Sequence, residues 1–505
     1  MNMLSIFATT DHITTVQDCI AQEARLNELV SVLDFLSHKP SPSGFNLIIR
    51  RKHIVFPIDW YNVLPPYILP EEVPFTPENL LGLVFARLGN YEKMHHYLAK
   101  SNPTLYTELD FINRLQNGIP VNPEELISEY SEFEEYRLMH NQALVRHYAA
   151  SESNFDLEKT RYFYREAMLS APNDEYKAFT VKQYATLLTD LGQLDFAENE
   201  LLPAIQYALS DEAKIELKNV LATVWMQKFS VPYDAVLLAQ LKEILWEILQ
   251  SYEQQKRLPE VGLLLIDAAH IANISESFAE ALGYVNRAIG IFRDEEMPEL
   301  LANAQLRKGT LLYTWAQNGQ PQFYRGAMES YQEALKIFTR EDAPAVFADI
   351  HHHLGVIYSE IPDEVQKKSI WAAVSSASFN EAMQFYNKAN FPYEYAMICN
   401  SFGNAMTKYP AALHSDNYEK ALFYYQEALN IRTAAEYPVE RAITLLNYVE
   451  ACWYINNSED EWNESLYYDM ISKAEEVKKL TPDTQMLADA DRHLAKLAEL
   501  RKIFS

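Results

Sequence analysis

Two stretches of helical pattern within residues 395–431 carry small and aromatic side chains at spacings that fit one another. Gly403 lies in the first stretch, and Ala421, Tyr425 and Ala428 lie in the second. Side chains three or four residues apart share one face of a helix, so the three residues of the second stretch point to the same side. A glycine lets a neighbouring helix approach closely, and the Tyr425 ring would fill the space beside it. The sequence therefore predicts two antiparallel helices packed through these residues.

Similar spacings recur along most of the chain. The pattern resembles the tetratricopeptide repeat, a helix–turn–helix unit of about 34 residues that stacks into a superhelix. The resemblance implies an all-α, tetratricopeptide-like helical-hairpin solenoid over residues 76–480. Successive second-helix alanines lie further apart than one standard repeat, which predicts lengthened or degenerate repeats, with the largest extra stretch at 359–379. The positions that carry the pattern are Leu81-Gly82 with Phe85; Ala185 with Ala197, Leu201 and Ala204; Ala281 with Val285 and Ala288; Gly309 with Ala327, Tyr331 and Ala334; and Leu354-Gly355 with Ala382, Tyr386 and Ala389.

The two ends of the chain depart from the repeat pattern. Apolar residues at three- and four-residue steps predict a helix over residues 1–40, and two β-branched runs around a polar centre predict a short β-hairpin over 45–57. Clustered prolines predict an irregular connection over 57–77. We therefore expect a small N-terminal non-repeat module or cap over 1–75, and a more charged C-terminal capping helix over 481–505.

The charge balance limits the kinds of partner. The chain has 43 basic and 70 acidic residues and a formal net charge of −27. Such a charge repels nucleic acid and anionic membranes and favours a protein or peptide partner of basic or neutral character. No run of 18 apolar residues occurs, the N-terminus lacks the pattern of a signal peptide, and three widely separated cysteines imply no disulfide framework. A soluble, cytoplasmic protein is expected, and its oligomeric state stays open.

Common catalytic motifs are missing from the sequence: it contains no HExxH, no P-loop, no GxSxG and no CxxC. His351, His352 and His353 are consecutive, and side chains about 100° apart on a helix cannot converge on one metal ion, so we expect polar residues of the surface or groove. We expect Cys399 and Cys452 to lie on helices at packing positions. We expect no enzyme activity, no metal and no cofactor.

The resemblance also implies where a partner would bind. In tetratricopeptide arrays the first helix of each hairpin lines the concave face, and matching motif positions here hold Asn303, Asp349, His352, Asn400, Asn404 and Lys182, with Asn447 and Glu450 in the last pair. An amide side chain can donate to a backbone carbonyl and accept from a backbone N–H, which suits an extended peptide. Equally, the asparagines could only satisfy neighbouring helix ends or loops. A clamp for a C-terminal carboxylate is disfavoured, because Lys182 has Thr186 where that clamp needs an asparagine.

These features predict a non-catalytic scaffold or adaptor that binds a protein or peptide in its concave face. Two alternatives remain open from the sequence. One is a regulatory sensor that responds to a peptide, as in bacterial receptors that share the repeat. The other is a non-catalytic structural subunit of a larger complex, which could itself be enzymatic.

Overall fold

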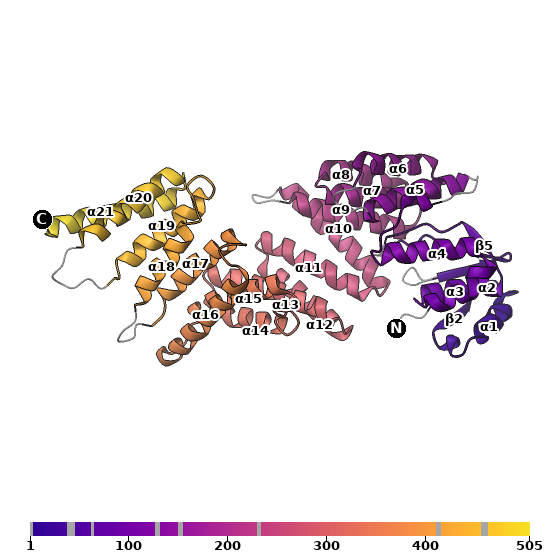
Figure 1. The fold of residues 1–505 in the computed structure, drawn as a ribbon, viewed down its shortest axis with the longest axis horizontal. Helices are drawn as coiled ribbons and strands as arrows, with labels where there is room; N and C mark the ends of the chain where they lie inside the picture. Colours follow the sequence, from indigo (N-terminus) through magenta and orange to yellow (C-terminus); the bar gives the residue numbers. More distant parts are fainter. Residues whose placement is uncertain are drawn as a thin grey trace. The chain divides into compact units, whose positions relative to one another are not determined.

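The computed structural model describes residues 4–37, 46–61, 65–126, 132–149, 155–229, 234–410, 416–455 and 463–504. The chain divides into two compact units, unit 1 at Met1–Leu264 and unit 2 at Leu265–Ser505. Helices dominate both units, and a small sheet lies near the N-terminus (Figure 1).

The described N-terminal residues form a mixed five-stranded sheet in the order β2-β1-β3-β4-β5. Strand β1 lies between β2 and β3 and runs parallel to both, whereas β3, β4 and β5 pair antiparallel in succession. The bounds are β1 Leu4–Ala8, β2 Val30–Asp34, β3 Asn46–Arg50, β4 His53–Val55 and β5 Glu72–Pro74, with helix α1 at Ile13–Ala21 and a 3₁₀ turn, η1, at Leu26–Glu28.

The prediction of helix across residues 1–40 is wrong in two places. Leu4–Ala8 and Val30–Asp34 are strands, and among the described residues of this range only Ile13–Ala21 forms an α-helix. Short apolar runs fit a helical period and a buried strand equally well. The pairing of β1 with two strands distant in sequence decides between them, and local periodicity cannot reveal such pairing.

The predicted hairpin over residues 45–57 is confirmed over its described part. Ile48 pairs with Val55 and Arg50 with His53 in antiparallel register. Arg51 and Lys52 connect the strands with φ values of 50° and 65°. Positive φ at both central residues is what a type I′ hairpin turn requires.

The sheet shares its hydrophobic core with the first helical hairpin. Ile6 and Ile49 from the sheet are fully buried in one cluster with Leu81 and Val84 of α2 and Leu98 of α3. A boundary near residue 75 therefore remains a proposal that rests on the change from strands to helices. Unit 1 continues with α2 Pro77–Arg87, α3 Tyr91–Ser101, α4 Pro103–Gln116, η2 Pro123–Glu125, α5 Glu132–Ala149, α6 Leu157–Ser170, α7 Asp174–Asp190, α8 Leu194–Tyr207, α9 Asp211–Lys228, α10 Ala235–Gln254 and the first part of α11 Leu258–Ile274.

Unit 2 consists of helices packed in consecutive pairs. The pairs are α13 with α14, α15 with α16, α17 with α18 and α19 with α20, and α21 packs on both α19 and α20. The bounds are α12 Phe278–Asp294, α13 Pro298–Gln317, η4 Pro321–Phe323, α14 Tyr324–Ala334, α15 Pro344–Glu360, α16 Val365–Phe385, α17 Pro392–Met406, α18 Asn417–Leu429, α19 Pro438–Cys452, α20 Glu464–Leu480 and α21 Thr484–Phe504.

Glycines face aromatic rings across several of these pairs. A Cβ atom at Gly403 would lie 2.5 Å from Tyr425 Cε1, and one at Gly309 would lie 2.8 Å from the Tyr331 ring. The predicted close approach beside Tyr425 is confirmed. Each position admits only a hydrogen, since real Cβ atoms do not come this close to another carbon.

At the third such pair the sequence prediction has the wrong aromatic residue. Phe379, not Tyr386, lies against Gly355, at 2.9 Å from the Cβ position. Tyr386 instead follows the end of α16 and donates a hydrogen bond to Asp349. The extra stretch at 359–379 forms a short connection and the first two thirds of α16, so it extends the second helix of this hairpin.

Candidate functional site

The first helices of the unit 2 hairpins form two adjoining hollows, which we call the unit 2 groove. The smaller one, of about 140 Å³, lies over α13, α15 and α17, and the larger one, of about 420 Å³, lies over α17, α18 and α19. Asn404 and Lys408 line both hollows. The larger hollow is also lined by Thr407, Tyr418, Tyr425, Asn447, Glu450, Ala451 and Tyr454.

Asparagines in the unit 2 groove are held in place by one internal hydrogen bond each. Tyr425 Oη donates to Asn404 Oδ1 at 2.7 Å, and Asn447 Nδ2 donates to Asn400 Oδ1 at 3.1 Å. The described residues provide no hydrogen-bond partner for Asn404 Nδ2 or for Asn447 Oδ1, and both side chains line the larger hollow. The groove therefore offers one amide donor and one carbonyl acceptor with fixed orientations, which is the pair that a peptide backbone can use.

The remaining predicted site residues are divided between the larger hollow and other parts of the chain. Asn303 is exposed on α13 and does not line either hollow. Asp349 accepts a hydrogen bond of 2.9 Å from Tyr386 Oη. Glu450 joins Asn404 and Asn447 in the larger hollow. The structure thus brings Asn404, Asn447 and Glu450 to one hollow, with Asn400 bonded to Asn447. Asn303 and Asp349 do not line it.

The histidine triplet is not the polar surface that the sequence predicts. His352 is 7% exposed, and burial lowers its pKa to about 3. The His353 ring stacks on Tyr331 with centroids 5.5 Å apart, and burial lowers its pKa to about 4. His352 is buried because its ring packs against Phe379 of α16, and the His353 ring is half-buried against Tyr331 of α14. Among the described residues no three His, Cys, Asp or Glu side chains form a group that could hold a metal ion.

The two cysteines of unit 2 are buried in helices, as predicted for packing positions. Burial raises the pKa of Cys399 and of Cys452 to about 12. Both thiols therefore stay protonated near neutral pH and lack the thiolate that nucleophilic catalysis uses. In the part of the chain that the structure describes, no helix is both long enough and apolar enough to span a membrane.

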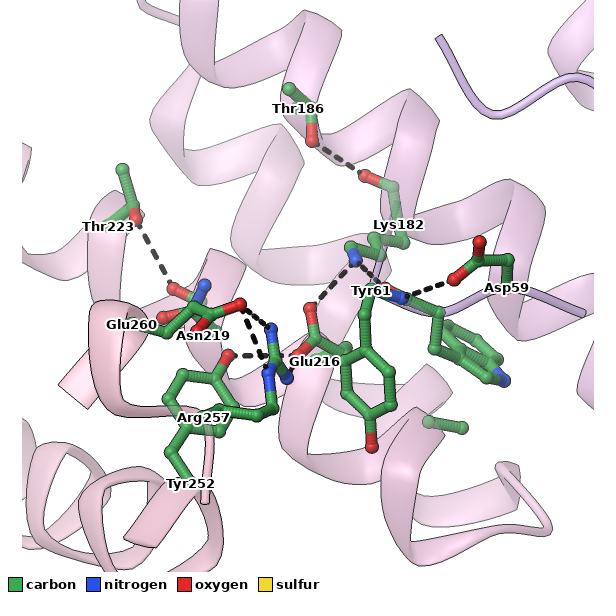
Figure 2. A network of polar contacts seen from close by, with 12 residues as sticks. Asp59, Tyr61, Lys182, Thr186, Glu216, Asn219, Thr223, Tyr252, Arg257 and Glu260 are labelled. Carbon is green, nitrogen blue, oxygen red and sulfur yellow. Dashed lines mark hydrogen bonds and ion pairs between the residues drawn. The ribbon is translucent and has the colours of Figure 1, made fainter. Parts of the chain in front are cut away.

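Lys182 belongs to a buried network in unit 1. Figure 2 shows Glu216 between Lys182 and Arg257: Lys182 Nζ lies 2.8 Å from Glu216 Oε2, and Arg257 Nη1 lies 2.8 Å from Glu216 Oε1. Tyr252 Oη donates to the same Oε1 at 2.9 Å. Burial acts to raise the pKa of Glu216, but the two cations outweigh it and lower that pKa. Because Lys182 is already paired, the structure gives it no role as a carboxylate clamp.

The connection after the hairpin lies along the first helices of unit 1 and is bound there through its backbone. Lys182 Nζ donates to the carbonyl of Trp60 at 2.7 Å, and the Trp60 indole donates to Glu175 Oε1 at 3.1 Å. Asn141 on α5 accepts from the N–H of Ile68 and donates to its carbonyl, both at 2.9 Å. Asn141 was not among the predicted site residues, because its repeat lacks the glycine that marks the pattern.

The paired helices and the glycines that face aromatic rings are the features of the repeat that the sequence resembles. The chain has a tetratricopeptide-like fold. No family model matches it, and no curated protein matches it.

Several solved structures align with this chain. A signal-transduction ATPase with numerous domains and a tetratricopeptide repeat sensor, from Pyrococcus horikoshii, is 17% identical over 83% of this chain, with a TM-score of 0.48. The chain spans 55% of the length of that structure. The quorum sensor NprR from B. thuringiensis, in its apo form, is 15% identical, with 72% of this chain and 97% of NprR covered and a TM-score of 0.39.

A Rap protein complexed with competence and sporulation factor is 14% identical, with 70% of this chain and 95% of Rap covered and a TM-score of 0.38. All three TM-scores lie below 0.5. The function of this chain therefore has to be argued from its own geometry.

Proposed function

We propose that this chain is a non-catalytic scaffold that binds an extended segment of a protein or peptide in the unit 2 groove. The observation that carries the proposal is the pair of oriented amides, Asn404 and Asn447, in a hollow of about 420 Å³. A side chain that is already held by one hydrogen bond loses little conformational freedom when a ligand binds.

Unit 1 contains an example of an asparagine side chain that binds peptide backbone. Asn141 binds the N–H and the carbonyl of Ile68 at the same time, in a segment of the chain without helix or strand. An asparagine side chain on α5 therefore binds a backbone N–H and a backbone carbonyl of a non-helical segment within this protein. Asn404 and Asn447 offer the same two functions, split between two side chains.

The acidic character of the chain favours a partner segment that is basic or neutral. A net charge of −27 attracts basic segments and repels acidic ones, and the attraction weakens as salt screens it. The proposed partner is a basic or neutral segment. An adaptor and a peptide-responsive sensor use the same groove, and they differ in whether the chain changes conformation when the peptide binds.

The test is selection of a phage-displayed library of random 12-residue peptides on the full-length chain, followed by fluorescence-anisotropy titration of the selected peptides. Asn404→Ala combined with Asn447→Ala should weaken binding by roughly tenfold or more, since each lost hydrogen bond contributes about 0.5–1.5 kcal/mol. Asn303→Ala is the matched control and should bind as the wild type does.

Thermal unfolding of the same variants separates binding from stability. The double variant should melt within a few degrees of the wild type, because each asparagine makes one internal hydrogen bond in a partly exposed place. Selected peptides that bind the double variant unchanged would show that the groove assignment is wrong. A library that gives no binders would favour the structural-subunit alternative.

A further inference from the structure

The larger hollow of the unit 2 groove has an aromatic wall. The rings of Tyr418 and Tyr454 stack with centroids 5.1 Å apart and planes 15° from parallel. Tyr454 is 56% exposed, so one face of the stack is open to a ligand. An exposed aromatic face attracts cations through the negative potential above the ring, and it binds a flat guanidinium group especially well.

A carboxylate lies in the same hollow. The Glu450 side chain is half exposed, and among the described residues it lies in ion-pair range of His493, whose Nε2 is 3.5 Å from Glu450 Oε2. Trp453 Nε1 donates to His493 Nδ1 at 3.0 Å, so Nδ1 is an acceptor and the ring carries its hydrogen on Nε2. Burial lowers the pKa of His493, which keeps the imidazole neutral at neutral pH. A neutral imidazole does not offset a carboxylate as a lysine or an arginine would.

The other charged residue of the hollow is Lys408. Its Nζ forms an ion pair with Glu360 Oε1, at the boundary with the smaller hollow. Glu360 offsets the charge of Lys408, and the charge of Glu450 has no such counterpart among the residues that line the larger hollow. The carbonyl oxygen of Asn447 adds an uncharged acceptor beside it.

We propose that this hollow is a subsite for an arginine side chain of the bound peptide. The guanidinium group would stack on Tyr454, pair with Glu450 and donate to Asn447 Oδ1. Arginine fits better than lysine because its planar group can stack and form two parallel hydrogen bonds at once. The inference rests on the proposed function and specifies the chemistry that the groove selects.

The experiment uses two fluorescein-labelled pools of nonapeptides that are random except at the central position. One pool has arginine at the centre and the other has citrulline, which keeps the shape of arginine and lacks its charge. Both pools are titrated against the full-length chain by anisotropy. Binding of the arginine pool should be at least about fivefold tighter. Glu450→Gln should remove most of this difference and leave only the smaller part that stacking on Tyr454 contributes.

Glu475→Gln is the matched control, because Glu475 is exposed on α20 and does not line the hollow. This variant removes the same charge and should keep the preference for arginine. Equal binding of the two pools to the wild type overturns the subsite. So does a preference for arginine that is as large in Glu450→Gln as in the wild type.

The two proposals fail in different ways. If both pools bind equally and the Asn404→Ala, Asn447→Ala variant weakens both, peptide binding stands and the arginine subsite is wrong. If no pool binds, both proposals are wrong.

Discussion

Asn141 and Ile68 are 73 residues apart in sequence, and the side chain of one makes two hydrogen bonds of 2.9 Å with the backbone of the other. Asn141 is 1% exposed and Ile68 is 8% exposed, so water cannot replace either bond. This contact ties the connection that follows the N-terminal hairpin to the helices of unit 1.

Asn141→Ala should therefore destabilise unit 1 strongly. The substitution leaves a buried N–H and a buried carbonyl unpaired, at about 1–3 kcal/mol each, and we expect a loss of about 2–4 kcal/mol in the free energy of unfolding. Urea denaturation measures it. Asn303→Ala removes the same amide from an exposed position and should change stability by less than about 0.5 kcal/mol. Similar midpoints for the two variants would show that the Asn141 bonds do not stabilise the fold.

Gly403→Ala and Gly283→Ala should have opposite effects. A methyl group at Gly403 meets the Tyr425 ring at 2.5 Å, and we expect overpacking to cost about 1–3 kcal/mol. At Gly283, inside α12, a Cβ would meet nothing within 4 Å, and alanine should stabilise the helix by up to about 1 kcal/mol. Both shifts can be measured as changes in the urea midpoint. A stabilised Gly403→Ala variant would contradict the close packing of α17 on α18.

The pH dependence of unit 2 should depend on His352. Burial lowers its folded-state pKa to about 3, against an ordinary value of 6.5, so the unfolded chain takes up the proton first as pH falls. The contribution of neutral His352 to the free energy of unfolding is therefore fully present above pH 6.5 and is lost as pH falls below it. At pH 5 the loss from this group is about 2 kcal/mol.

His352→Gln should reduce the difference in unfolding free energy between pH 7 and pH 5 by about that amount, whatever it costs at pH 7. His95→Gln replaces an exposed imidazole and serves as the control, with the wild-type difference retained. Identical pH profiles for wild type and His352→Gln would mean that the imidazole is hydrated in the folded chain.

Glu216→Gln should destabilise unit 1 by about 3–5 kcal/mol at pH 7, because two buried cations lose their shared partner. The folded-state pKa of Glu216 is lowered below 4.5, so its contribution is present above that pH and is lost as pH falls through the folded-state value. The difference in unfolding free energy between wild type and Glu216→Gln should thus narrow below pH 4.5. Glu247→Gln, which breaks a half-exposed ion pair with Lys218, should cost no more than about 1 kcal/mol. A gap that stays constant down to pH 3 would exclude the charged network.

The sequence predicts those parts of the fold that depend on residues close together in the chain. Gly403 and Tyr425 lie on consecutive helices at a standard spacing, so their contact could be anticipated. Phe379 replaces Tyr386 beside Gly355 because the lengthened α16 shifts the register of the second helix. Strand β1 was missed because it becomes a strand only by pairing with residues 30–34 and 46–49, which are distant in the sequence.

For the candidate site, too, the sequence predicts what depends on the repeat and misses what depends on contacts between distant residues. Motif positions place Asn404 and Asn447 on first helices, and their meeting in one hollow follows from the stacking of hairpins. Motif positions give no indication that Lys182 is paired with Glu216 or that Asn141 holds Ile68. Both contacts depend on where the N-terminal connection lies, and a repeat pattern does not contain that information.

The bonds from Asn141 to Ile68 and from Lys182 to the carbonyl of Trp60 have a consequence for how this chain can evolve. Arrays of repeats can gain or lose whole hairpins, because each repeat contacts only its neighbours. A duplicated copy of the hairpin α5–α6 would move α7 one repeat further from the sheet, and the two bonds could no longer form together. The N-terminal connection thus restricts the number of hairpins at the start of the array, because both bonds form only when α5 and α7 keep their present separation.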